Sequence, residues 1–472
     1  MGQEIDSATF QQRDFDEFHQ RLVAETRLLE EMLRDGKLDN SEPVAGYELE
    51  AWLVDGNGDP APRNVPFLQA LDDPDVVAEL ATFNIELNGP PEPLAGHALS
   101  RMQQSLEGNW QRCQQMADSM GMHLQGIGIL PTIRPRHLIL EHMSQLKRYV
   151  ALNQQILRLR GGKPIELLIE GEERLALSHD DVMLESAATS FQIHLQVAAK
   201  LAARYYNAAK IVSAAVVAVS ANSPFLFGRQ LWEETRIPLF EQAVSVGASD
   251  RTNRVSFGYR YLDSSIFEVF ALNLERYPVL LPMLTDDDSR QLSHLRLHNG
   301  TIWRWNRPLV GFSADGRPHI RIEHRVVPAG PTHVDQFANA ALFYGLVTAL
   351  AHAGKAPEKR LPFSACKANF YRAAKEGVNA RVEWLDGEHG SLKTLCLERL
   401  LDQAQQGLLL AGIDGHEAAY YLDVIRQRLQ SGQTGAAWQK KWVDRYGPQW
   451  RDLTLCYAEH QQTALPVHRW SL

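Results

Sequence analysis

The expected fold depends on one segment in which apolar and polar residues alternate, Tyr47-Glu48-Leu49-Glu50-Ala51-Trp52-Leu53-Val54. Such alternation is typical of a β-strand with one buried face. Because residues two apart in a strand point to the same side, we expect Glu48 and Glu50 to lie side by side. Their charges repel each other, and a divalent cation such as Mg²⁺ would turn that repulsion into coordination. An isolated Glu-x-Glu is more often a solvated strand face, so the interpretation depends on the other strands.

Three further segments predict strands that carry an acid or an imidazole on one face. They are residues 83–88 with Asn84 and Glu86, residues 190–197 with His194 between Gln192 and Gln196, and residues 319–325 with Arg321, Glu323 and Arg325. Each alone has an ordinary explanation, such as a solvated acid, a hydrogen-bonded histidine or a surface row of ion pairs. Together they would line a funnel with metal ligands and with arginines for phosphate or carboxylate groups. The hypothesis requires these strands to be neighbours, which the sequence does not establish.

The spacing of apolar residues predicts helices between the strands. The expected helices are 14–34, 75–80, 99–120, 198–219 and 332–352, and further strands are expected at 123–130 and 300–305. Strands that are polar on one face favour an α+β fold with a mostly antiparallel sheet, because parallel sheets usually bury both faces. We expect the apolar helix at 198–219 to lie in the core rather than at a subunit interface, and assembly into a homo-oligomer is left open.

After residue 377 the sequence predicts helices and no further strands. Helical patterns at 391–407, 415–429 and 438–460 predict a helical C-terminal extension. We therefore divide the chain into a catalytic domain, residues 1–377, and an extension, residues 378–472.

Composition excludes several classes of protein. A net charge of −9 argues against a nucleic-acid-binding protein. The four cysteines are far apart and form no Cys-x-x-Cys pair, which is typical of reduced thiols in a cytoplasmic protein. The N-terminal residues lack the pattern of a secretory signal, and the longest apolar run is too short to span a membrane, so we expect a cytoplasmic location and no membrane contact.

Common nucleotide and nucleophile motifs are missing. The chain has no Gly-x₄-Gly-Lys-Ser/Thr loop, no Gly-x-Gly-x-x-Gly turn after a strand and no Gly-x-Ser-x-Gly elbow. A nucleotide, if bound, is therefore held by another kind of site.

An ordered set of motifs resembles a known family. The matching pieces are residues 46–50, 79–88, 191–197, 221–224 and 321–325, which together span about residues 44 to 350. This set is similar to the carboxylate–amine ligases related to glutamate–cysteine ligase, the type 2 glutamate–cysteine ligases. The resemblance implies a glutamine-synthetase-like catalytic domain with a curved, mostly antiparallel sheet flanked by helices.

The resemblance also implies the chemistry and the site. ATP and Mg²⁺ would phosphorylate a carboxylate, and an amine would attack the acyl phosphate to give an amide, ADP and phosphate. By motif position the Mg²⁺-site residues would be Glu48, Glu50, Glu79, Glu86, His194 and Glu323. Glu50, Glu323 and Arg325 would take part in catalysis, and Arg325, Asn222 and Arg236 would shape the nucleotide or substrate pocket. The partners would be a small carboxylate, such as glutamate or another amino acid, and an amine.

Two other functions remain open from the sequence. A metal-dependent hydrolase would use the same acids and His194 to activate water, and it would ignore ATP. A non-catalytic binding protein with a relict site would not bind Mg-ATP. If like charges crowd the site, Glu50→Gln and Glu323→Gln should abolish turnover and leave the melting temperature unchanged or raised.

Overall fold

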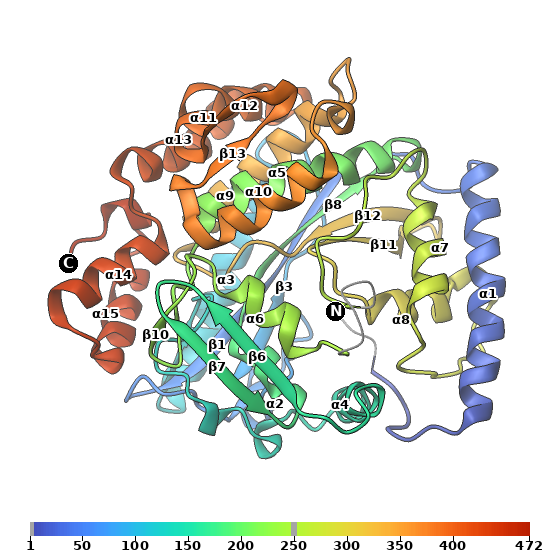
Figure 1. Cartoon of the computed structure of the whole chain (residues 1–472), viewed down its shortest axis with the longest axis horizontal. Helices are drawn as coiled ribbons and strands as arrows, with labels where there is room; N and C mark the ends of the chain where they lie inside the picture. Colours follow the sequence, from blue (N-terminus) through green and yellow to red (C-terminus); the bar gives the residue numbers. More distant parts are fainter. Residues whose placement is uncertain (1–3, 247–252) are drawn as a thin grey trace.

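A curved antiparallel sheet forms the centre of the computed structural model, which describes residues 4–246 and 253–472 (Figure 1). In spatial order its strands are β11 (Asn306–Phe312), β12 (Pro318–His324), β8 (Phe191–Val197), β1 (Val44–Asp55), β3 (Asn84–Asn88) and β2 (Val76–Ala78), while β4 (Glu92–Pro93) and β5 (Met122–Gln125) pair with other parts of β1. Every pair in this sheet is antiparallel. The expectation of an α+β fold with a mostly antiparallel sheet is confirmed.

The strand register brings the polar residues to one face of the sheet. Glu50 lies opposite Glu86 in the β1–β3 pair, and His194 lies opposite Glu323 in the β8–β12 pair. Glu48 lies opposite Gln192 across β1 and β8. Residues directly opposite in an antiparallel pair share a face. The four polar strands, β1, β3, β8 and β12, are therefore neighbours in one sheet, as the hypothesis requires.

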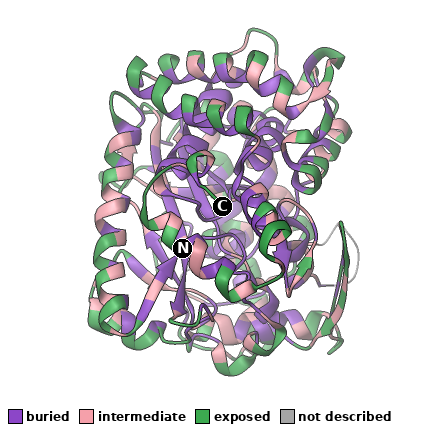
Figure 2. Cartoon of the chain, turned by 90° about the vertical axis from the view of Figure 1, so that its left-hand side faces the viewer, coloured by how far each residue is buried: buried purple, intermediate pink, exposed green. Residues whose placement is uncertain are grey.

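Helices cover the other face of the sheet. They are α3 (Ala98–Ser119), α5 (Ala202–Ser220) and α9 (His333–Ala351). The rings of Tyr47 and Phe191 contact Phe337 of α9, with ring centroids 5.4 and 5.5 Å apart. The α5 helix is buried along nearly its whole length, which confirms that it belongs to the core. Figure 2 shows this buried centre in purple and the exposed outer surfaces of the surrounding helices in green.

The polar face of the sheet looks toward a second set of elements. They are α4 (Lys147–Leu159), α6 (Arg236–Ala243) and α8 (Ser293–Gly300), with α1 (Gln12–Arg34) packed on α8 and on α7 (Phe267–Arg276). A hairpin of β6 (Ile165–Glu170) and β7 (Arg174–His179) packs on α6, whereas α2 (Asn64–Leu71) packs on α3 and β2. A 3₁₀ segment, Val182–Ala187, leads into β8. No helix in the described part of the chain is long and apolar enough to cross a membrane.

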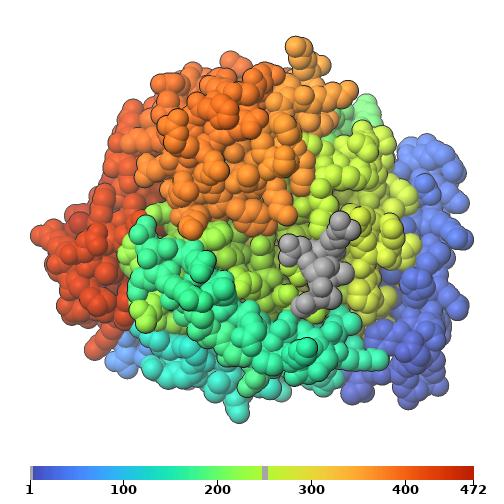
Figure 3. Space-filling view, viewed as in Figure 1, coloured from blue at the N-terminus to red at the C-terminus, as the bar shows by residue number. Residues whose placement is uncertain are grey.

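The C-terminal residues are helical, as expected. After α10 (Phe363–Glu376) come α11 (Leu392–Leu395), α12 (Leu401–Leu410), α13 (Gly415–Ser431), α14 (Gly435–Tyr446) and α15 (Trp450–Gln462). Figures 1 and 3 show these segments, in orange and red, against the body of the molecule. α12 and α13 pack on α9, and α12 comes so close that a Cβ on Gly345 or Gly407 would collide with the facing backbone. The extension thus completes the helical layer behind the sheet, while the division at residues 377 and 378 stays a prediction.

Two expected elements near the site are wrong. Residues 75–80 are not a helix, because β-branched Val76 and Val77 favour a strand and β2 pairs with β3 there. Residues 300–305 are not a strand, because α8 ends at Gly300 and pairing with β12 starts only at Asn306. The alternating tryptophans Trp303 and Trp305 instead contact Phe240 of α6, with ring centroids 6.4 and 5.9 Å away.

Two expected boundaries also move. The strand expected at 123–130 ends at Gln125, where pairing with β1 stops. The single helix expected at 438–460 is two helices, because Gly447 takes a positive φ of 81° and the following proline lacks the N–H of a helical turn.

Candidate active site

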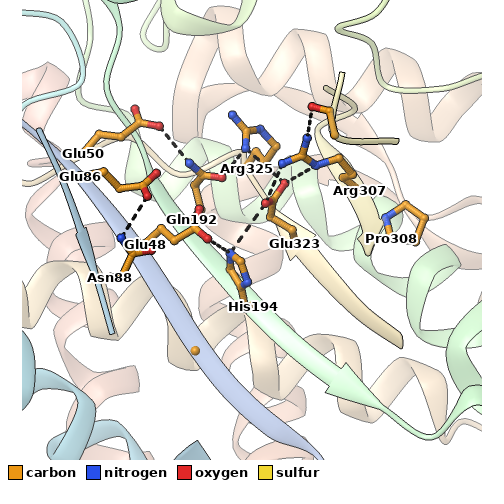
Figure 4. Close-up of polar contacts among 12 residues, drawn as sticks. Glu48, Glu50, Glu86, Asn88, Gln192, His194, Arg307, Pro308, Glu323 and Arg325 are labelled. Atoms are coloured by element: carbon orange, nitrogen blue, oxygen red, sulfur yellow. Dashed lines mark hydrogen bonds and ion pairs between the residues drawn. The ribbon is translucent and has the colours of Figure 1, made fainter. Parts of the chain in front are cut away.

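Three side chains that could bind a metal ion meet on the polar face of the sheet. Glu48 from β1, His194 from β8 and Glu323 from β12 offer ligand atoms that all lie within 4.8 Å of one another (Figure 4). The Nε2 atom of His194 is 3.4 Å from Oε1 of Glu48 and 3.8 Å from Oε1 of Glu323. All three residues are buried, and we call them the metal triad. The triad gathers three of the six residues expected at the metal site.

The chemistry of the triad fits a divalent cation. His194 Nε2 is buried and has no hydrogen-bond partner among the described residues. Burial lowers the pKa of His194 to about 4, although the charge of Glu48 acts in the opposite direction. The imidazole is therefore neutral at physiological pH, with a nitrogen facing two carboxylates. Two carboxylate oxygens and a neutral imidazole nitrogen are a donor set for a metal ion.

Glu323 is held in its ionised form by two arginines. Arg307 donates to both carboxylate oxygens, from Nε to Oε2 at 2.8 Å and from Nη2 to Oε1 at 2.9 Å. Arg325 donates from Nη1 to Oε2 at 3.2 Å. Burial alone would raise the pKa of Glu323, but the charges of Arg307 and Arg325 hold it well below its usual range. This bidentate contact fixes the direction of the carboxylate as well as its charge.

Glu50 is connected to the same group through Gln192. Gln192 donates from Nε2 to Oε1 of Glu50 at 2.9 Å, and the backbone N–H of Ser190 donates to Oε2 at 2.7 Å. Arg325 in turn donates to the side-chain oxygen of Gln192. Burial raises the pKa of Glu50, against the effect of Arg325. The chain Glu50–Gln192–Arg325–Glu323, visible in Figure 4, couples the two ends of the site.

Three further carboxylates crowd the other end. Burial and the charge of Glu48 raise the pKa of Glu86 to about 7, while burial and the charge of Glu50 raise that of Glu185 to about 8. The pKa of Glu79 lies well above its usual range because of burial and the charge of Glu86. Glu79 reaches this cluster because it follows strand β2 rather than ending a helix. Crowded carboxylates of this kind favour a bound cation.

A cavity of about 220 Å³ opens over these residues. Its acidic lining consists of Glu48, Glu50, Glu79, Glu86 and Glu185 of the 3₁₀ segment. Part of its wall is apolar, formed by Phe240, Val244, Leu281, Leu295 and Trp303 among others. Such a wall excludes water from the charged lining and strengthens electrostatic interactions there.

Two residues expected at the pocket are not among the residues that line the cavity. The amide nitrogen of Asn222 donates to the carbonyl of Ala329 and to the hydroxyl of Tyr457, each at 2.8 Å, so Asn222 joins the end of α5 to α15. Arg236 donates to Glu234 at 3.1 Å and to the carbonyl of Val326 at 3.2 Å. Neither residue lines the cavity. Their positions do not support the nucleotide or substrate contacts expected of them.

Arg307 and Glu185 were not predicted as site residues. Arg307 was missed because the strand was expected to end at residue 305, whereas β11 starts at Asn306. Continuing the alternation past Trp305 would have placed Arg307 on the face of Trp303 and Trp305 and could have found it. Glu185 lies in a short 3₁₀ segment, for which the sequence shows no periodic signal.

Comparisons with known proteins show the family and the fold of the chain. The model of the family described as glutamate-cysteine ligase family 2 matches residues 44–452. A solved glutamate–cysteine ligase from Francisella tularensis, in complex with AMP, is similar in structure with a TM-score of 0.58, 11% identity, and 90% of each chain covered. A bifunctional glutathione synthetase from Pasteurella multocida has a TM-score of 0.55 and 12% identity, over 93% of this chain and 55% of that one. No curated protein sequence matches significantly. The glutamine-synthetase-like fold is confirmed, and the family match extends beyond residue 378.

Proposed function

The chain belongs to glutamate-cysteine ligase family 2 and is an ATP-dependent carboxylate–amine ligase, and we propose that it works through an acyl phosphate with Mg²⁺ bound in the cavity. The observation that carries the proposal is the metal triad, Glu48, His194 and Glu323, beside a cavity that is lined by Glu48 and Arg325. The acid substrate would be glutamate or another small carboxylate, and the acceptor a small amine.

The residues of the triad would hold a metal ion, and Glu50, Glu79 and Glu86 provide carboxylates for a further ion. Bound Mg²⁺ would supply charge neutralisation for the polyphosphate of ATP. Arg325 lines the cavity beside the triad, and its guanidinium suits the oxygens of the transferred phosphoryl group. Arg307 acts indirectly, by keeping the carboxylate of Glu323 ionised and fixed in its orientation within the triad.

In the first step an oxygen of the substrate carboxylate bonds to the γ-phosphorus while the bond from that phosphorus to ADP breaks. In the second step the amine nitrogen bonds to the acyl carbon and inorganic phosphate leaves. The attacking ammonium must lose a proton first. Glu185 lines the cavity, and in its ionised form it is suited to accept the proton, because burial and the charge of Glu50 raise its pKa to about 8 and make it a stronger base than an ordinary carboxylate. The apolar wall keeps water from hydrolysing the acyl phosphate.

A hydroxylamine trap tests this function. The protein is incubated with Mg-ATP, hydroxylamine and a panel of amino acids and other carboxylic acids, and hydroxamate and ADP are measured. We expect both products with one acid or a narrow class of acids, and neither without ATP. Glu323→Gln should abolish them, while the exposed control Glu398→Gln should not.

The same assay separates the two alternatives. A metal-dependent hydrolase would release product from its substrate without consuming ATP. A binding protein with a relict site would form no ADP with any acid. If no hydroxamate and no ADP form with any acid of a broad panel, the ligase function is refuted.

A further inference from the structure

Helix α1 lies outside the residues that the family model matches, yet it contacts a helix that lines the cavity. The family match begins at residue 44, whereas α1 covers residues 12–34. It packs on α7 and α8, and Figure 1 shows it beside them at the edge of the molecule. Helix α8 contributes Leu295, Leu297 and Asn299 to the lining of the cavity. A side chain of α1 that holds α8 can therefore affect the site without lining the cavity itself.

Glu25 of α1 is a buried carboxylate, with 3% of its surface exposed. Its Oε1 lies 2.6 Å from Nδ1 of His294, and its Oε2 accepts a hydrogen bond from the backbone N–H of Leu295 at 2.8 Å. The other ring nitrogen of His294 accepts from the backbone N–H of Thr285 at 3.4 Å, so Nδ1 carries the proton and donates to Glu25. A buried carboxylate is costly unless it is hydrogen-bonded, and α8 engages both oxygens of this one.

Helix α8 depends on Glu25 because its own N-cap residue cannot cap it. That residue, Leu292, has an apolar side chain and a left-handed backbone with a φ of 53°. The first N–H groups of a helix have no partner within the helix, and a carboxylate at that end also interacts favourably with the helix dipole. Glu25 supplies an oxygen to one of these N–H groups from a different helix. The position of α8 is therefore set in part by α1.

The other end of α8 contacts the arginine that fixes the metal triad. The carbonyl of Gly300, the last residue of α8, accepts a hydrogen bond from Nη1 of Arg307 at 3.0 Å. The other two nitrogens of Arg307, Nε and Nη2, donate to the carboxylate oxygens of Glu323. The contacts thus run without interruption from Glu25 through α8 and Arg307 to Glu323, a member of the triad.

We propose that Glu25 is a positioning residue for the metal triad, which acts through α8 and Arg307. A shift of α8 would move the carbonyl of Gly300, and the guanidinium of Arg307 would then hold Glu323 in a less favourable direction. Loss of a partner that orients a metal-binding side chain typically weakens metal affinity about 10- to 100-fold. The inference rests on the proposed function only in that it takes the triad to bind Mg²⁺.

Calorimetric titration of the full chain with Mg²⁺, in the absence of substrate, tests the positioning role. The variants are Glu25→Gln, which keeps one accepting oxygen, and Glu25→Ala, which keeps none. We expect the affinity for Mg²⁺ to fall about tenfold in Glu25→Ala and by a smaller factor in Glu25→Gln. Glu30→Gln, which changes an exposed acid of the same helix, should bind Mg²⁺ like wild type. Unchanged affinity in both Glu25 variants would overturn the proposal.

Glu417 provides a matched control for the loss of a buried cap. This buried carboxylate of α13 accepts hydrogen bonds from the backbone N–H groups of Leu99 and Ser100, at the start of α3. Because α3 lies behind the sheet, Glu417→Ala removes the same kind of contact on the face away from the cavity. Both alanine variants should melt at a lower temperature, but only Glu25→Ala should lose affinity for Mg²⁺. An equal loss of affinity in Glu417→Ala would overturn the proposal. If Glu25→Ala does not fold, Glu25→Gln compared with Glu417→Gln decides in the same way.

A double-mutant cycle tests the route through Arg307. If Glu25 acts through this arginine, Glu25→Ala combined with Arg307→Gln should bind Mg²⁺ no more weakly than Arg307→Gln alone. Additive losses of affinity would overturn the route.

The hydroxylamine trap keeps this inference separate from the proposed function. A wild-type protein that forms hydroxamate but binds no Mg²⁺ would overturn the positioning role and leave the ligase activity standing. An affinity for Mg²⁺ that depends on Glu25, in a protein that forms no hydroxamate, would refute the ligase mechanism and leave the positioning role standing.

Discussion

The two faces of the central sheet are made by alternate residues of the same strands, and they differ in almost every physical property. On β8, Gln192 and His194 face the cavity, while Phe191 and Ile193 are buried on the other side. The apolar face packs on α5 and α9, and the C-terminal helices cover α9 in turn. The cavity face carries buried charges, of which Glu323 is the most completely neutralised. The comparison predicts that stability depends on the helical face and activity on the cavity face, with Glu323 as the exception.

Removing the C-terminal helices is the strongest test of the helical face. We expect a chain cut after residue 377 not to fold, because α9 is buried on all sides and α12 and α13 supply one of those sides. Circular dichroism and gel filtration would check this. A fragment 1–377 that unfolds cooperatively at the wild-type temperature would make residue 378 a true domain boundary.

Glu323→Gln should damage both properties. Turnover should fall by at least about 10³-fold, as expected for a residue that positions and neutralises charge in the transition state. The free energy of unfolding should fall by about 3 kcal/mol, because Arg307 and Arg325 would keep buried charges with no carboxylate. This revises the expectation from like-charge crowding for an acid that lies between two arginines, while for Glu50 that expectation stays a prediction. Urea unfolding monitors the second effect, and an unchanged stability would contradict it.

The stability of the metal-free protein should depend on pH in a direction set by the crowded carboxylates. The pKa of Glu86 is raised to about 7 and that of Glu185 to about 8, above the ordinary value of 4.5, so the folded state binds more protons than the unfolded state between these values. Buried histidines such as His194, whose pKa is lowered to about 4, act in the opposite direction below their ordinary pKa of 6.5. Stability should therefore fall as pH rises from about 7 to 8, where the carboxylates dominate. Urea midpoints with EDTA would measure the fall. Mg²⁺ should flatten it, and a rise of stability over the same range would contradict the assignment.

Glu86→Gln isolates one member of that group. The variant should be more stable than wild type by about 1 kcal/mol at pH 8 without metal, because a buried charge is removed. Addition of Mg²⁺ should also raise the melting temperature of the variant less than that of wild type. A variant that is less stable than wild type would show that Glu86 is needed for packing rather than for binding.

Tyr344→Phe should change stability and leave activity unchanged. The hydroxyl of Tyr344 in α9 donates to the carbonyls of Gly46 and His194, at 3.1 and 3.0 Å. Losing these contacts from the helical face should cost about 1–2 kcal/mol and leave KM unchanged. A change in KM without loss of stability would break the division between the two faces.

The strand period explains what the sequence could predict. Alternation with a period of two is enough to place Glu48, Glu50, Glu86, His194 and Glu323 on the polar faces of their strands. Their convergence needs the strand order, which comes from pairing between segments far apart in the chain. The resemblance to a family of ligases indicated that these residues share one site, but it gave no strand order.

Other parts of the site have no local signal. Glu185 depends on a 3₁₀ segment, and Arg307 depends on where pairing with β12 begins. Asn222 was misplaced because its motif marks the end of α5, where its amide holds α15 by tertiary contacts. Positions set by packing between distant elements do not appear as a pattern in the local sequence.

A crystal structure with Mg²⁺ and a non-hydrolysable ATP analogue would decide whether the metal triad binds the catalytic cation. We expect a metal ion bound by Glu48, His194 and Glu323, with the phosphates of the nucleotide in the cavity beside Arg325. A second cavity, of about 460 Å³, lies near α3 and α15 and is lined by Trp110 and His333. Nucleotide bound there, with no metal at the triad, would refute the assignment of the active site.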